Sequence, residues 1–403
     1  MKLAVLCPHF APDLAPTGEV MTRIVSELAA RGHELHIVTA LPWYQHHRIE
    51  PGWGGRPVRT EKTTWGSITR IHPFPSPDKR SIPRRALGFA GFSALAGIMG
   101  LRGGRVDGVL VMSPPLTLGL TGWAIRLVRR GPLVFNIQDV FPDAAIETGA
   151  ITNAHLIRFA NWLERTSYRR SQAVTVLSDD LRDNLRAKLP TAQHHKIRVI
   201  PNFVDTEAIR PVDRMTAYRA ELGIGDEQVV MYAGNVGFSQ SLDMFLHAAR
   251  RLAPVTFVIN GGGSALESLR SDAAGLANVR FGPYQPRERL SEVLGTGDLH
   301  VVPLRAGLAR VSVPSKTYSI LAAGRPVVAA VDPGTEVAKI VTSAGCGVAI
   351  PPDDAEIFTR AIQETLASSQ LTAMGERGRR WVEHWASPAA VAAAYESLFA
   401  ELT

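Results

Sequence analysis

The chain opens with the stretch KLAVLCPHFAPDLAPTGEVMTRIVSELAARG (residues 2–32), in which an apolar run, a loop and an amphipathic pattern follow one another. Residues 2–7 predict a buried strand, because the run is short, apolar and followed by Pro8. Apolar residues at helical spacing then predict a helix over 20–31, and Gly32 is a helix stop signal. A strand that leads through a loop into a helix is the repeating unit of an α/β fold.

The same alternation continues along both halves of the chain. We expect further strands at 34–40, 108–112, 133–138, 173–177 and 198–200, and in the second half at 229–233, 256–260, 279–281, 299–303 and 326–330. Helical patterns lie between them, for example at 242–252 and 286–295. This order predicts an α/β protein with two Rossmann-like domains, each a doubly wound parallel sheet with helices on both faces.

The two halves are joined by residues 201–213, which contain two prolines and no periodicity, and which we interpret as a linker. We therefore expect domains at 1–204 and 205–384. The last helical pattern is broken at Pro388, and its final part, about 385–403, is expected to cross back to the first domain. Two such domains predict a cleft between them, where the carboxyl ends of parallel strands bind ligands.

Cysteine content and charge restrict the class of protein. Cys7 and Cys346 are the only cysteines, which gives neither a zinc-binding spacing nor a disulfide framework. The first apolar run is too short for a signal peptide, so we expect a cytoplasmic protein. Residues 1–204 hold 26 Lys and Arg against 15 Asp and Glu, whereas residues 205–403 hold 18 against 22. The basic half predicts an anionic partner, but nucleic acid is disfavoured because no nucleic-acid-binding signature is present.

An uncharged segment, residues 86–101, lies between two groups of basic residues. It is shorter than the ~20 apolar residues that span a bilayer. Two interpretations stay open: an interfacial helix whose basic ends contact anionic lipid, or a core helix of the first domain. The nearby loop with Trp43, Trp53 and Trp65 is either an aromatic membrane anchor or a lid over an acceptor.

Three strand-to-helix connections have the small residues that a phosphate group or nucleotide requires. These are Thr17, Gly18 and Glu19 before the first helix, Asn235 and Gly237 after the strand at 229–233, and Gly262 at the end of the strand at 256–260. Glycine allows the backbone to approach a ligand closely, and a helix N-terminus favours an anion. Ordinary helix caps and turns are the alternative interpretation.

Pro314 and Ser315 are typical of a helix start, and Lys316 follows them. A cation in the first turn of a helix is unfavourable unless an anion compensates it. A phosphate held by Lys316 and by backbone N–H groups would compensate the charge, whereas a solvated lysine is the alternative.

Five motifs in this order resemble those of the retaining family-4 glycosyltransferases, which have the GT-B fold. The motifs are the opening loop with residues 31–33, residues 137–143, residues 196–205, residues 232–235, and residues 314–318 with 321–328. They cover nearly the whole chain and are most similar to the branch that builds bacterial surface polysaccharides, including colanic-acid and O-antigen fucosamine-type transferases.

The resemblance implies transfer of a sugar from a nucleotide diphosphate donor, a UDP-sugar, to a lipid-linked or glycolipid acceptor in cell-envelope polysaccharide synthesis. The enzyme would act as a peripheral protein on the inner face of the plasma membrane. The first domain would bind the acceptor and the second domain the donor. No metal or other cofactor is required, and the adjacent histidine pairs at 46–47 and 194–195 do not form a metal site.

The resemblance also implies roles for single residues. The base and ribose would lie near Gly262 and Tyr284, the diphosphate near Gly18, Gly237, Arg310 and Lys316, and the donor loop would include Glu336. Asp139 would lie at the reacting sugar and is, with Lys316, a catalytic candidate; a strand-end aspartate that caps backbone is the alternative.

The sequence departs from the family pattern at four positions. Val311 and Ser319 stand where many members have two glutamates, and Phe238 and Gln240 stand in the region of a common Arg and Lys. Lys316 and Arg310 are then the remaining cations for a diphosphate. Two alternatives stay open: a nucleotide-sugar epimerase of the same fold, and an inactive scaffold subunit of a glycan assembly.

Overall fold

The computed structural model describes the chain except for residues 14, 45, 76–81, 139, 141–142, 144–152, 238 and 308–315, and the side chains of 82–86. The chain divides into two compact units. The first unit consists of Met1–Asn202 and Val391–Thr403, and the second of Phe203–Ala390.

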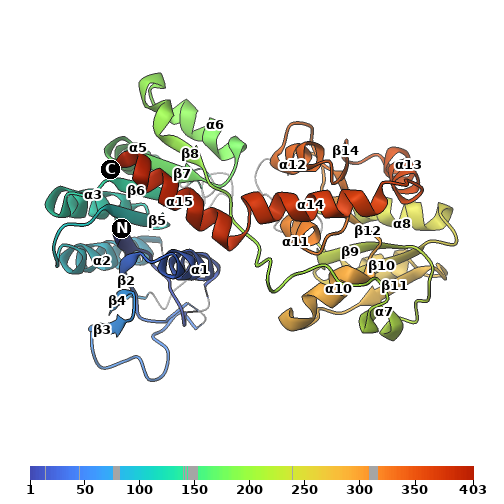
Figure 1. Cartoon of the computed structure of the whole chain (residues 1–403), viewed down its shortest axis with the longest axis horizontal. Helices are drawn as coiled ribbons and strands as arrows, with labels where there is room; N and C mark the ends of the chain where they lie inside the picture. Colours follow the sequence, from blue (N-terminus) through green and yellow to red (C-terminus); the bar gives the residue numbers. More distant parts are fainter. Residues whose placement is uncertain are drawn as a thin grey trace. The chain divides into compact units, whose positions relative to one another are not determined.

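The first unit is built on an eight-stranded sheet in the order β3-β4-β2-β1-β5-β6-β7-β8 (Figure 1). The strands are β1 (Lys2–Leu6), β2 (Glu34–Ala40), β3 (Val58–Thr63), β4 (Gly66–Ile71), β5 (Gly108–Ser113), β6 (Leu133–Ile137), β7 (Ala173–Val176) and β8 (Ile197–Val199). All neighbouring strands are parallel except β3 and β4, which form an antiparallel hairpin at one edge.

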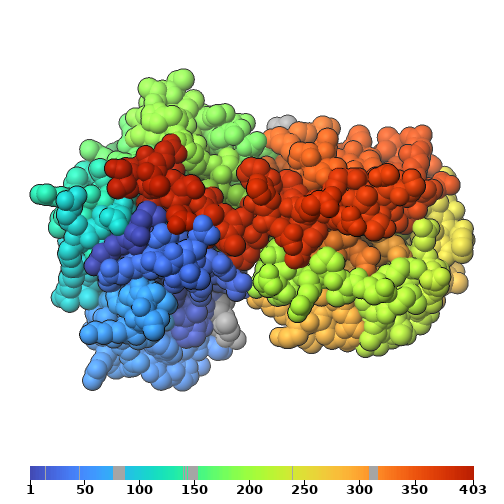
Figure 2. All heavy atoms as spheres, in the orientation of Figure 1, coloured from blue at the N-terminus to red at the C-terminus, as the bar shows by residue number. Residues whose placement is uncertain are grey.

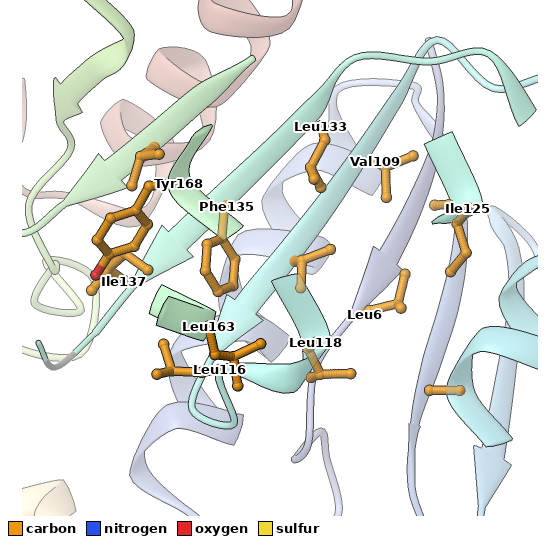
Figure 3. Close-up of a cluster of buried hydrophobic side chains, with 14 of the residues drawn as sticks. Leu6, Val109, Leu116, Leu118, Ile125, Leu133, Phe135, Ile137, Leu163 and Tyr168 are labelled. Atoms are coloured by element: carbon orange, nitrogen blue, oxygen red, sulfur yellow. The ribbon is translucent and has the colours of Figure 1, made fainter. Parts of the chain in front are cut away.

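The main core of the first unit lies between this sheet and the helices α2 (Ile82–Gly100), α3 (Thr117–Arg129), α5 (Ala154–Arg170) and α6 (Asp179–Lys188). Figure 3 shows Ile125 and Leu163, from α3 and α5, near apolar strand residues such as Phe135. Every second strand residue faces this core, because side chains alternate along a strand. Helices cover an apolar sheet face in this way in α/β folds.

Asn136 points to the opposite face of the first sheet, where its amide donates to the Tyr395 hydroxyl at 2.8 Å. Tyr395 belongs to α15 (Pro388–Leu402), and α15 is also tied to the residue after α1 (Pro16–Ala30) by an ion pair between Arg31 and Glu396. Figure 2 shows the last residues, in dark red, beside the blue N-terminal segment. The end of the chain is therefore part of the first unit.

The second unit has a six-stranded parallel sheet in the order β11-β10-β9-β12-β13-β14 (Figure 1). The strands are β9 (Val229–Asn235), β10 (Thr256–Gly262), β11 (Val279–Gly282), β12 (Leu299–Pro303), β13 (Val327–Ala330) and β14 (Gly347–Ile350). The helices are α7 (Ala217–Glu221), α8 (Leu242–Arg251), α9 (Leu266–Asp272), α10 (Leu290–Thr296), α11 (Lys316–Ala322), α12 (Glu336–Ala344), α13 (Ala355–Leu366) and α14 (Leu371–Trp385). Short 3₁₀ turns cover Thr191–Lys196 in the first unit and Arg287–Arg289 in the second.

The predicted class, two Rossmann-like parallel-sheet domains, is confirmed, and each expected strand is present within two residues of its predicted ends. Three strands were not predicted: β3, β4 and β14. The first helix begins at Pro16, earlier than the expected 20–31, because proline suits the first helical turn. Thr17, Gly18 and Glu19 therefore lie within α1 and not in a loop before it, which corrects the prediction.

Residues 86–101 fall mostly within α2, which packs on α3 and on the sheet. Phe92 and Ala96 are in the core, whereas Leu87 and Ile98 are exposed. Trp43, Trp53 and Trp65 are each half-buried. No helix in the described part of the chain is long and apolar enough to cross a membrane.

Candidate active site

The carboxyl ends of β9 and β10 form a glycine-rich edge in the second unit. Gly234, Gly261 and Gly263 have φ angles of +142°, +144° and +155°. A Cβ atom on Gly261 would lie 2.0 Å from the Gly234 carbonyl oxygen, and one on Gly263 would lie 2.2 Å from the Val236 carbonyl oxygen. Only glycine fits where two backbones approach so closely. The edge therefore presents bare backbone, a surface to which a ligand can approach closely.

Lys316, the first residue of α11, reaches this edge. Its ammonium group donates a 2.9 Å hydrogen bond to the Tyr232 hydroxyl and lies 4.2 Å from the centre of the Tyr232 ring. A Cβ atom on Gly234 would be 3.8 Å from the Lys316 Nζ. The Tyr232 hydroxyl in turn donates to the Asn235 carbonyl. The tyrosine thus holds the lysine side chain in one position beside the glycine backbone.

Burial lowers the pKa of Lys316 to about 8. Among the described residues, no carboxylate lies within ion-pair distance of its ammonium group, and Tyr232 supplies only a neutral oxygen and a ring face. A buried cation without a counter-ion is costly unless it is neutralised by a ligand. The arrangement is chemically suited to binding an anion.

Gly237 and Asn235 follow Lys316's partner Tyr232 along the chain. The backbone N–H of Gly237 donates to the Gln240 side-chain oxygen at 3.0 Å, and the Asn235 side chain is exposed. The Gly237 N–H is thus already engaged by the Gln240 side chain. A phosphate that accepted from this N–H would have to displace the Gln240 side-chain oxygen. The structure places Asn235, Gly237 and Lys316 at the same edge of the second sheet.

Tyr284 and Gly262 are also adjacent. The Tyr284 hydroxyl donates to the Gly262 carbonyl at 3.2 Å, and its ring lies 3.3 Å from the position of a Cβ on Gly262. The ring is 60% exposed. An exposed aromatic face at the end of a parallel strand offers a stacking surface for a planar base.

Glu336 is the first residue of α12, directly after the loop that follows β13. The same loop contains Asp332, which accepts a 2.8 Å hydrogen bond from the backbone of Gly307. Asp139, Arg310 and Ser315 lie outside the described residues, as does Val311, so their predicted roles stay predictions.

In the first unit, Gly18 is required for packing. A Cβ atom there would lie 2.8 Å from the His9 Cβ, so α1 lies directly against the loop that follows β1. The backbone N–H of Glu19 donates to the carbonyl oxygen of Ala15, the residue that precedes α1. The three residues Thr17, Gly18 and Glu19 thus form the first turn of α1 beside His9.

That loop holds a histidine–carboxylate pair that the sequence analysis missed. His9 Nδ1 and Asp13 Oδ2 are 2.6 Å apart, and both residues are buried. The other oxygen of Asp13 accepts from the backbone N–H groups of Trp43 and Tyr44, and the His9 ring stacks on Trp43. Because the carboxylate is an acceptor, Nδ1 carries the proton, and a neutral His9 has its lone pair on Nε2. In the sequence, the pair could have been found from the spacing of four residues between His9 and Asp13 directly after the first strand.

A second buried ionic group lies beside the segment after β6. Lys188 is 2.8 Å from both Asp143 and Glu164, and the Glu164 side chain is fully buried. Burial raises the pKa of Glu164, although Lys188 and the Tyr168 hydroxyl oppose the shift. Lys188 therefore connects α5 and α6 to Asp143, four residues after the catalytic candidate Asp139. Among the described residues, no group of three metal-ligating side chains is present.

Comparison with known proteins assigns both halves of the chain to families of glycosyltransferases. Residues 17–208 match the family described as Glycosyltransferase Family 4, and residues 227–368 match Glycosyl transferases group 1. The chain belongs to glycosyltransferase family 4. The two matches follow one another along the chain, and each covers most of one Rossmann-like domain.

Curated relatives of this glycosyltransferase have similar lengths. A putative colanic acid biosynthesis glycosyl transferase, WcaI of Escherichia coli, is 27% identical over 91% of this chain and 92% of its own. The probable glycosyltransferase WbjE of Pseudomonas aeruginosa is 25% identical over 68% of this chain and 69% of its own.

Solved structures share the fold of this glycosyltransferase. Sucrose-phosphate synthase from Thermosynechococcus elongatus superimposes with a TM-score of 0.68 at 18% identity, covering 100% of this chain and 99% of that one. Anabaena HepE, solved in complex with UDP-glucose, has a TM-score of 0.62 at 14% identity, with both chains fully covered. The lipopolysaccharide glycosyltransferase WaaG has a TM-score of 0.60 at 16% identity, over 100% of this chain and 99% of its own. These similarities establish the GT-B fold.

Proposed function

We propose that this glycosyltransferase moves a sugar, with retention of anomeric configuration, from a UDP-sugar to a lipid-linked or glycolipid acceptor in the synthesis of a cell-envelope polysaccharide. The observation that carries the proposal is Lys316, a buried ammonium group held by Tyr232 beside the glycine backbone. The name of WcaI, a putative colanic acid biosynthesis glycosyl transferase, supports the polysaccharide, and the UDP-glucose bound by HepE supports the nucleotide.

The second domain binds the donor in this proposal. The diphosphate lies against Lys316, Gly237 and Asn235, and the base stacks on Tyr284 beside Gly262. Arg310, Ser315 and Glu336 complete the donor site. Lys316 stabilises the negative charge that develops on the departing diphosphate, and electrostatic stabilisation of this kind is often the largest catalytic contribution.

The first domain binds the acceptor. His9 Nε2 is the acceptor for a hydrogen bond from a hydroxyl of the acceptor sugar that does not react, because Asp13 holds the proton on Nδ1. The bond between the anomeric carbon and the diphosphate oxygen breaks, the new bond to the acceptor oxygen forms on the same face, and the hydroxyl proton passes to the leaving diphosphate. In this proposal Asp139 acts at the reacting sugar. The reaction requires no metal or other cofactor.

We further propose that the enzyme works in the cytoplasm, on the inner face of the plasma membrane, where a lipid-linked acceptor is presented. The test is incubation of the purified protein with labelled UDP-sugars and a lipid extract. We expect the label to appear in the lipid phase. NMR of the product should show that the new glycosidic linkage has the same anomeric configuration as the sugar in the donor. Transfer with the opposite anomer would contradict retention, isomerised donor without transfer would favour an epimerase, and no turnover despite donor binding would favour an inactive scaffold.

A further inference from the structure

Three helices that cover one face of the first sheet, α2, α3 and α5, carry several large apolar side chains on their outer surfaces. Seven of the thirteen exposed large hydrophobic side chains of the described residues come from these helices or from the residue that follows α2. They are Leu87, Ile98, Leu101, Leu127, Val128, Phe159 and Trp162. Single exposed apolar residues are normal, but a concentration on one helix layer indicates an interaction surface. We call these helices the outer helix layer.

The most apolar part of this layer is an aromatic pair on α5. Phe159 and Trp162 are 56% and 55% exposed, and their rings stack with centroids 5.8 Å apart. Residues three apart on a helix lie on the same face, so both rings project outward together. A tryptophan ring has an apolar body and a polar N–H, which suits the boundary between lipid tails and headgroups.

The same face of α5 carries three arginines, Arg158, Arg165 and Arg169. Together with Trp162, Asn161 and Thr166 they line a hollow of about 450 Å³. None of the three pairs with a carboxylate among the described residues, and the guanidinium group of Arg158 contacts only the His155 ring. Guanidinium groups bind phosphate oxygens in a bidentate geometry. The hollow is therefore suited to phosphate groups.

Acidic residues are nearly absent from the outer helix layer. Residues 82–130 and 153–170 contain eleven arginines but only Asp107 and Glu164 as acids. Asp107 accepts a hydrogen bond from the backbone of Lys2, and Glu164 is fully buried. An ordinary solvated helix face mixes charges of both signs, so this layer is suited to a partner of negative charge.

We propose that the outer helix layer docks onto the surface of an anionic phospholipid bilayer. Phe159 and Trp162 insert at the level of the headgroups, the aliphatic residues of α2 and α3 extend the apolar contact, and Arg158, Arg165 and Arg169 bind lipid phosphates. Anionic lipid matches both the charge and the exposed apolar area, whereas a nucleic acid leaves Leu127, Val128 and Ile98 without apolar contacts. The inference rests on the proposed function only in one respect: membrane docking would bring the enzyme to its proposed lipid-linked acceptor.

The test measures co-sedimentation of the full chain with vesicles. Vesicles of phosphatidylcholine with 30% phosphatidylglycerol are compared with pure phosphatidylcholine, and both with a 20-bp duplex DNA. We expect binding to the anionic vesicles that weakens with added salt, because surface charges are screened. Arg158→Gln/Arg165→Gln/Arg169→Gln should lose about 100-fold in vesicle affinity, since each basic residue near an anionic surface contributes about a fivefold factor. Phe159→Ser/Trp162→Ser should lose at least about tenfold.

Matched controls come from the second unit. Trp385 is 57% exposed, and Arg251, Arg270 and Arg380 are all engaged in ion pairs. Trp385→Ser and Arg251→Gln/Arg270→Gln/Arg380→Gln should bind vesicles as the unmodified protein does. Far-UV circular dichroism and the melting temperature show that each variant is folded.

The thermal shift produced by UDP separates this inference from the proposed function. A variant that loses vesicle binding but keeps the UDP shift supports the docking surface. If UDP produces no thermal shift in the unmodified protein, the proposed donor is contradicted. The vesicle binding of the variants then still tests the docking surface separately. Equal vesicle binding by the α5 variants and their controls, no binding to anionic vesicles at all, or tighter binding to the duplex than to the vesicles would each overturn the docking surface.

Discussion

The Lys316 ammonium group lies 2.9 Å from the Tyr232 hydroxyl, although 84 positions separate the two residues in the chain. Tyr232 is buried in β9 and Lys316 begins α11, so the contact joins a central strand of the second sheet to the helix that follows β12. Because the tyrosine is neutral, it fixes the position of the cation without neutralising it. The first two predictions follow from this contact.

Replacing Lys316 with alanine should weaken binding of UDP by roughly 10- to 100-fold, because hydrogen bonds to charged groups contribute about 1.5–3 kcal/mol. Isothermal titration with UDP measures the change. Lys339→Ala is the control, since Lys339 is an exposed lysine of α12 in the same unit. Equal affinity for both variants would place the diphosphate elsewhere.

The affinity for UDP should fall as the pH rises above about 8. Burial lowers the pKa of Lys316 to about 8, so the ligand-free protein loses this proton there, whereas a bound diphosphate favours the charged form. The affinity should be constant from pH 7 to about 8 and then fall by up to tenfold per pH unit, the limit for one proton. Titrations at pH 7 to 9.5 test this. In Lys316→Arg, which stays charged, the curve should be flat, and an unchanged slope would exclude Lys316 as the titrating group.

Gly261→Ala should destabilise the protein far more than Gly275→Ala. Both glycines have positive φ angles, so both substitutions introduce backbone strain. Only the alanine at 261 would also place a Cβ 2.0 Å from the Gly234 carbonyl oxygen, whereas the space around residue 275 is empty to 4 Å. We expect a difference in unfolding free energy of about 2 kcal/mol or more in urea denaturation. A similar loss of unfolding free energy in both variants would show that the ends of β9 and β10 can move apart at no cost in stability.

Replacing Lys188 with methionine should cost about 3–5 kcal/mol, because it leaves the buried carboxylate of Glu164 without its cation. The double variant Lys188→Met/Glu164→Gln should recover much of that loss, since no buried charge is then left unpaired. Urea unfolding of the two single variants and the double variant measures the coupling. Additive losses would mean that Glu164 is neutral in the folded protein.

His9→Ala should slow sugar transfer at least about tenfold without changing the affinity for UDP, because His9 belongs to the first unit and the donor site to the second. His195→Ala, an exposed histidine of the first unit, is the control. Steady-state rates and UDP titrations on both variants separate the two effects. A loss of UDP affinity in His9→Ala would argue against an acceptor-side role.

The regular strands were predictable from the sequence because buried parallel strands are short apolar runs, as in β2 and β12. The hairpin of β3 and β4 was not, because it is half-exposed at the sheet edge and its residues, such as Arg59 and Glu61, are largely polar. The first turn of α1 was missed because Pro16 looked like part of the loop.

A residue of the candidate site was predictable from the sequence only where its residue type is unfavourable at that position unless a ligand is bound. Lys316 after a helix-start signal could be identified from the sequence, but its partner Tyr232 depends on how β9 and α11 pack. The His9–Asp13 pair required the loop conformation that also gathers the backbone of Trp43 and Tyr44, which no local pattern specifies. The basic face of α5 was hidden in the sequence because Glu164 interrupts it, and only the structure shows that this acid is buried.

The central claim, that this glycosyltransferase binds a nucleotide diphosphate sugar, is tested most directly by a thermal-shift panel of UDP, GDP, TDP and ADP on the purified protein. A ligand that binds only the folded state adds about 2.7 kcal/mol of stability at a hundredfold excess over its Kd. We predict a clear rise in melting temperature with UDP that Lys316→Ala reduces. No rise with any of the four nucleotides would contradict the claim.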